Sequence, residues 1–150
     1  MVVLFSTFAV AQQDDGLSGK KIEEGSRYSG PALSREELSQ CIGQGERLNE
    51  LDIEIDDLEE TASARRAELE SNEATLIEAK GVVDASSQSS VDKFNALVDK
   101  HGNLADQYNA LLMQLNERIA ARHEAADLYD SSCAQKAYFD SDLNAIRQAR

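Results

Sequence analysis

The chain has 150 residues, with 28 acidic side chains against 15 basic ones, and its formal net charge is −13. This charge argues against binding to nucleic acid or to an anionic membrane surface, because both require a basic protein surface. The chain has no Trp and only 4 Tyr and 4 Phe, which is few for a compact domain of this length. Length and composition therefore suit one domain, or one long element with tails.

The first eleven residues carry no charge, and Val2–Val10 forms a mostly apolar run of nine residues. This run is too short for a membrane-spanning helix, which needs about 20 residues. It ends in Ala9-Val10-Ala11, the small-x-small pattern that signal peptidases cleave, although no Lys or Arg precedes it. We expect a signal peptide over 1–11, cleavage after Ala11, and a periplasmic or secreted protein. The alternative is a buried strand or the start of a helix.

Residues 12–33 are polar and rich in Gly and Ser, without a sustained hydrophobic period, so we expect a flexible linker there. A strong helix start follows this segment. Ser34 suits an N-cap, and Glu37, three residues later, would complete a capping box. Leu33 and Leu38 stand where a hydrophobic staple would place them.

Two long helices are predicted beyond this start, the first from residue 35 to about 85 and the second from 91 to about 133. The serine-rich residues 86–90 separate them, and serines in such a run favour a turn over a helix interior. Ser90 could cap the second helix. Residues 141–150 are expected to form a tail or a short helix.

Apolar residues recur every seven positions in both helices, which is typical of a coiled coil. The first series is Cys41, Leu48, Ile55, Ala62, Leu69, Leu76 and Val83, and the second is Val91, Val98, Ala105, Leu112, Ile119, Ala126 and Cys133. Each member of the first series has a counterpart in the second such that the two residue numbers sum to 174, as facing positions of a hairpin turning at residue 87 would. The sequence therefore predicts an all-α fold, a long antiparallel two-helix coiled-coil hairpin over 34–140. A globule of three or four helices is the alternative.

The two cysteines, Cys41 and Cys133, fall in one layer of this mirror pattern. In an exported protein such a pair favours one disulfide within the chain. An intermolecular bridge and two buried free thiols are the alternatives. A catalytic pair is not indicated, because no C-x-x-C motif and no neighbouring His is present.

The same sum sets Asp52 opposite Arg122 and Glu73 opposite His101. Opposite charges at seam positions fix the register of a coiled coil, and this is the interpretation that we favour. A functional interpretation makes Glu73 and His101 a proton-transfer pair or part of a metal site. The other histidine, His123, would lie about 33 Å from His101 along one helix, so we expect no metal site within one chain and no cofactor.

Two surfaces are candidates for binding a protein partner. The run 50–60 holds seven carboxylates, and its members Asp56, Asp57, Glu59 and Glu60 could attract a basic partner, although a solvated face is the simpler interpretation. A third apolar series, Leu97, Leu104 and Leu111, widens the apolar face of the second helix beyond the needs of two helices. It suggests pairing of two hairpins into a four-helix homodimer, or capture of a client segment. A further group could fold back on the base of the hairpin: Tyr138, Phe139, Leu143 and Ile146.

The sequence contains no nucleotide-binding, zinc-protease or nucleophile-elbow motif, and we expect no enzymatic activity. The favoured hypothesis is an exported coiled-coil interaction protein of the bacterial periplasm, acting as an adaptor, a spacer or a holdase-type chaperone. The alternative is an envelope stress protein that binds a ligand or metal at a site formed only in a dimer.

Overall fold

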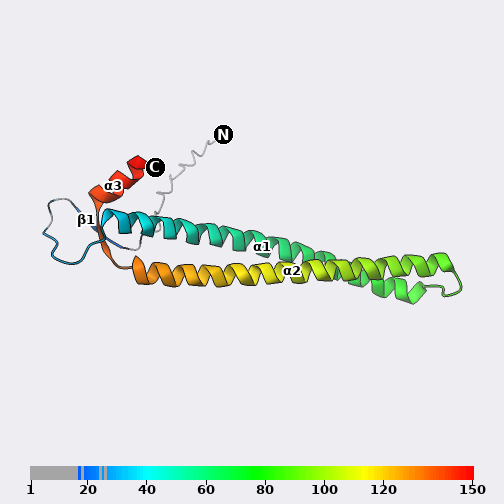
Figure 1. Cartoon of the computed structure of the whole chain (residues 1–150). Helices are drawn as coiled ribbons and strands as arrows, with labels where there is room; N and C mark the ends of the chain where they lie inside the picture. The colour runs from blue at the N-terminus through cyan, green and yellow to red at the C-terminus, as the bar shows by residue number, and fades with distance from the viewer. Residues whose placement is uncertain (1–16, 18, 24, 26) are drawn as a thin grey trace, which may run out of the picture. The chain divides into compact units, whose positions relative to one another are not determined.

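The computed structural model describes residues 17, 19–23, 25 and 27–150. The predicted signal peptide lies outside these residues. Two long helices, α1 and α2, pack closely as a helical hairpin, which confirms the predicted fold class (Figure 1). In the described part of the chain, no helix is both long and apolar enough to cross a membrane. The elements in chain order are β1 (Lys20–Ile22), α1 (Arg35–Val82), α2 (Gln88–Ser132), β2 (Ala137–Phe139) and α3 (Asp140–Ala149).

The described residues divide into two compact units. The first, here the base unit, comprises the described residues up to 47 together with residues 127–150. The second, here the arm unit, comprises residues 48–126. Both long helices contribute residues to both units.

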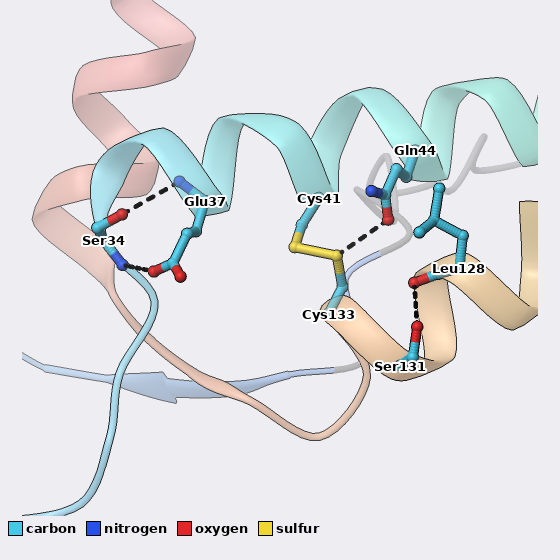
Figure 2. Close-up of a disulfide and its surroundings, with 7 residues drawn as sticks. All are labelled: Ser34, Glu37, Cys41, Gln44, Leu128, Ser131 and Cys133. Carbon is cyan, nitrogen blue, oxygen red and sulfur yellow. Dashed lines mark hydrogen bonds between the residues drawn. A yellow bond between two sulfur atoms is a disulfide. The ribbon is translucent and has the colours of Figure 1, made fainter.

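In the base unit, α1 begins with the predicted capping box (Figure 2). The backbone N–H of Ser34 donates to Oε2 of Glu37 at 2.8 Å, and the backbone N–H of Glu37 donates to Oγ of Ser34 at 3.2 Å. These bonds satisfy two donors that the helix start would otherwise leave unpaired. Leu33 and Leu38, the predicted staple residues, are both buried.

The described part of the segment 12–33, which was predicted to be a linker, contains the strand β1 and belongs to the base unit. β1 pairs with β2 in parallel, with Lys20 opposite Ala137 and Ile22 opposite Phe139. On the other side of β2, Ala32 forms a bridge with Ala137, whose carbonyl accepts the N–H of Leu33 at 2.8 Å. Strands of three residues are too short to show a hydrophobic period, so the sequence alone could not separate them from a loop.

The C-terminal segment folds into the base unit as α3. Its side chains Leu143 and Ile146 are buried. Asp140 pairs with Lys21 at 3.0 Å, and Asp142 pairs with Arg35 at 2.9 Å. The predicted return of this segment to the base is therefore observed, and Tyr138 is buried there as well.

In the arm unit, the turn between the helices lies earlier than predicted, over residues 83–87. The Asp84 carboxylate accepts hydrogen bonds from the backbone N–H of Ser86 at 2.9 Å and from its hydroxyl at 2.7 Å. Ser90 does not cap α2, which begins at Gln88; its hydroxyl accepts the N–H of Asp84 at 3.0 Å. The carboxylate closes the turn, and the last serines of the run enter the first helical turn.

The seam of the arm unit keeps the same two heptad series throughout α1 but changes series along α2. Leu51, Ala62 and Asn72 are buried on α1, at spacings of the predicted heptads. On α2 the buried residue is Leu104, which is 4% exposed, whereas Val98 of the predicted series is 45% exposed. The predicted mirror therefore fails at Val98.

Spacing explains this change of series. The half-buried or buried seam residues of α2 run as Leu97, His101, Leu104, Tyr108, Leu111, Leu115, Ile119 and Arg122. Two successive steps of four residues occur at 111, 115 and 119. Two successive four-residue steps interrupt the regular alternation of three and four, and such an interruption shifts a heptad seam onto the neighbouring series. Before Leu115 the seam therefore contains the leucine series, and Val98 lies outside it.

Candidate interaction surfaces and the disulfide

The two cysteines form the predicted disulfide within the base unit (Figure 2). Cys41 comes from α1 and Cys133 follows the last residue of α2, and their Cα atoms lie 5.5 Å apart. Both are buried, at 2% exposure. The bond joins residues 92 positions apart, so it restricts a long loop of the unfolded chain.

A polar hollow of about 280 Å³ lies beside this disulfide. The side-chain oxygen of Gln44 lies 3.3 Å from Sγ of Cys133; neither atom carries a proton, so this is a polar contact and not a hydrogen bond. The hydroxyl of Ser131 donates a hydrogen bond to the Leu128 carbonyl at 3.0 Å. Glu37 is committed to the capping box. Of the polar side chains that line the hollow, Ser131 and Glu37 are thus engaged in local hydrogen bonds.

A second hollow of the base unit, of about 540 Å³, is lined by the first turns of α1 and by α3. Arg35 and Arg150 lie at its rim, but Arg35 is paired with Asp142 and Arg150 with Glu46. Glu36 adds a further negative charge. The arginines are thus neutralised by neighbouring carboxylates, and the hollow does not favour an anion.

The acidic run on α1 divides into bonded and solvated carboxylates. Asp52 accepts a charged hydrogen bond from Arg122 at 2.9 Å, as predicted; this bond and the attraction of the carboxylate raise the pKa of Arg122. Glu54 pairs with Arg118 at 2.9 Å. Their residue numbers do not sum to 174, so the mirror pattern did not predict this pair. The four carboxylates predicted to bind a partner are all exposed: Asp56, Asp57, Glu59 and Glu60.

The leucine series does not provide the free apolar surface that was predicted. Leu104 is buried and Leu97 and Leu111 are half-buried, so the series lies in the hairpin seam. A partner could not reach Leu104 without opening the two helices. α2 does have apolar residues beyond those in the hairpin seam, but they belong to the series Val91, Val98, Ala105 and Leu112 and not to the leucine series.

Glu73 and His101 do not form a recognisable site. Glu73 is exposed, and Nδ1 of the half-buried His101 is buried without a hydrogen-bond partner. Asn72, next to Glu73, is 5% exposed, and its Oδ1 also lacks a partner. Across the described residues, no three His, Cys, Asp or Glu side chains are grouped closely enough to hold a metal ion.

Comparison with known proteins adds no functional information. No protein family model, no curated protein and no solved structure matches the chain.

Proposed function

We propose that this protein is a non-enzymatic, exported interaction protein that presents its coiled-coil hairpin to other proteins, as an adaptor, a spacer or a holdase-type chaperone of the bacterial periplasm. The observation that carries the proposal is the disulfide between Cys41 and Cys133 in a helical hairpin. Disulfides persist in oxidising compartments and are rare in the cytosol. The apolar N-terminal run with its Ala9-Val10-Ala11 cleavage pattern supports the same compartment.

Partner binding is supported by the exposed carboxylates of α1. Asp56, Asp57, Glu59 and Glu60 are exposed on the arm unit. Exposed charges of one sign accelerate encounter with an oppositely charged protein. A basic partner would therefore associate fastest at low ionic strength.

The test is site-specific photocrosslinking in the cell that produces the protein. p-Benzoyl-phenylalanine is introduced at Asp57 on the arm unit or, as a matched control, at the exposed Gln148 of α3. Discrete crosslinked proteins from position 57 and none from position 148 are expected. Absence of crosslinks at both positions, with the protein recovered from its native compartment, would contradict the adaptor and holdase roles. N-terminal sequencing of the same material should begin at Gln12; an intact Met1 in a cytosolic fraction would contradict export.

A further inference from the structure

The outer side of α2 in the arm unit carries an apolar series that the hairpin leaves partly uncovered. Val91, Val98, Ala105 and Leu112 recur every seven residues. Val98 is 45% exposed, and the other three are half-buried. Because the leucines occupy the seam, this stripe is available to a further helix, and its spacing is the one that helices use in packing against each other.

A row of aspartates follows the same spacing. Asp92, Asp99 and Asp106 each come one residue after a member of the apolar series, about 100° further around the helix. All three are exposed. The residues three and four positions away from them are Ser, Asn, Gln, Ala and Gly, so no Lys or Arg of the same helix stands where it could form an ion pair with them.

The basic residues of this part of α2 lie elsewhere on the helix. Lys93 and Lys100 come two residues after Val91 and Val98, which places them about 200° away around the helix. They therefore do not neutralise the side that carries the valines. The apolar series on that side is therefore bordered by a row of aspartates that no Lys or Arg of α2 neutralises.

No large side chain lies between the apolar series and the row of aspartates on the surface of α2. Asn95, Gly102 and Asn109 come four residues after Val91, Val98 and Ala105, and so share their face of the helix. A Cβ atom added at Gly102 would meet nothing within 4 Å. Small side chains at a helix contact allow a short distance between helix axes.

We propose that this surface, here the Val/Asp face, docks an amphipathic helix of a partner protein whose apolar stripe is flanked by Lys or Arg. The apolar series and the aspartates share a seven-residue spacing, which favours a helical partner. Because the bordering charges are all negative, a helix with basic residues beside its apolar stripe is favoured. A second copy presenting the same face would bring aspartates towards aspartates, which is repulsive. The inference rests on the proposed role as an interaction protein and names the surface and the partner chemistry.

The first experiment measures binding of two designed peptides of 21 residues to the full chain. Both carry Leu at the a and d positions of three heptads; one has Lys and the other Glu at the flanking positions. The Lys peptide should bind at least about tenfold more tightly than the Glu peptide, and this difference should shrink as salt is raised. Equal binding of the two peptides, or no binding of the Lys peptide, would overturn the proposal.

The second experiment locates the binding surface with variants of equal charge. Asp92→Asn/Asp99→Asn/Asp106→Asn is compared with Glu78→Gln/Glu117→Gln/Glu124→Gln, which removes three charges from other exposed positions of the arm unit. The first variant should weaken Lys-peptide binding by about tenfold and the second by less than about twofold. Val98→Gln should weaken it by about fivefold at high salt as well, because it removes apolar contact.

Three results would contradict the Val/Asp face: equal weakening by the two charge variants, no effect of Val98→Gln, or a dimer of the parent chain that Val98→Gln converts to a monomer. The last result would assign the face to a second copy. The in-cell crosslinking at Asp57 does not depend on these residues. Crosslinked partners combined with failed peptide binding would therefore reject this inference and leave the proposed function standing, and the reverse outcome would reject the proposed function alone.

Discussion

The base unit and the arm unit are stabilised in different ways. The base unit contains most of the buried apolar side chains, the disulfide and a small parallel sheet, and the last two join residues far apart in the sequence. The arm unit contains a repeating seam in which Leu51, Ala62 and Leu104 are buried and polar atoms of Arg65, Asn72 and His101 are buried without partners. The chain therefore places most of its buried apolar side chains and its covalent cross-link in the base unit, and the arm unit retains unsatisfied polar groups.

Removing the disulfide should have the largest effect. The chain-entropy model gives a loss of about 4 to 5 kcal/mol for Cys41→Ser/Cys133→Ser, because the bond closes a long loop. Thermal unfolding should shift to lower temperature while the helical circular-dichroism signal at room temperature stays close to that of the parent. Parent protein treated with reductant is the control and should behave like the variant. An unchanged unfolding curve would mean that the base unit does not depend on this bond.

Matched leucine truncations should separate the two units. Leu38 in the base unit is 0% exposed and Leu51 in the arm unit is 1% exposed. Each Leu→Ala change should cost about 2 to 5 kcal/mol through lost burial and the cavity that remains. Hydrogen exchange should show Leu38→Ala loosening amides of the base unit and Leu51→Ala loosening those of the arm unit. Equal loosening of all amides by both variants would show that the chain unfolds as one cooperative unit.

Local signals in the sequence predicted the features that depend on neighbouring residues. The capping box of Ser34 and Glu37 follows from a spacing of three, and the hairpin and its disulfide follow from heptads mirrored about residue 87. Both patterns are visible because each is repeated or reciprocal. The turn was displaced by a few residues because Asp84, and not the serines alone, closes it.

Two features were not predicted: the first carries no periodic signal, and the second carries a signal that the seven-residue spacing alone does not reveal. The pairing of β1 with β2 joins three-residue strands separated by more than a hundred residues, and short strands carry no periodic signal. The exchange of valines for leucines in the α2 seam depends on the two successive four-residue steps near Leu115. A search for such steps would have placed Leu104 in the seam and Val98 outside it.

The buried asparagine of the arm unit gives a prediction of opposite sign. Asn72 is 5% exposed, and its Oδ1 has no hydrogen-bond partner. Asn72→Leu should stabilise the protein by about 1 kcal/mol, since it removes a buried polar group that is not satisfied and adds apolar contact. Urea unfolding measures this change, and Asn95→Leu at an exposed position of α2 serves as the control. A destabilised Asn72→Leu variant would show that the amide has a partner in solution.

The smallest predicted effect concerns acid, and it compares one carboxylate of each unit. Hydrogen bonds from the Ser34 backbone and hydroxyl hold the pKa of Glu37 below its ordinary value of 4.5. Bonds from the Ser86 hydroxyl and backbone hold the pKa of Asp84 below its ordinary value of 3.8. A lowered pKa means that each carboxylate stabilises the fold fully above its ordinary value, and that this contribution disappears as pH falls through the lower, folded value.

Glu37→Gln and Asp84→Asn should therefore each be less stable than the parent at neutral pH, and the difference should shrink as the solution is acidified below those ordinary values. Stability against urea, measured at closely spaced pH values from 7 to 2, checks this for both variants. Both groups are exposed, so the effects are small, and the position of the pH window is the informative quantity. Glu37→Gln should lose its difference over a range that begins higher than that of Asp84→Asn, because its ordinary pKa is higher. If the stability difference between each variant and the parent stays constant down to pH 2, the amide substitutions act by disturbing packing. The negative charges of Glu37 and Asp84 would then not contribute to stability.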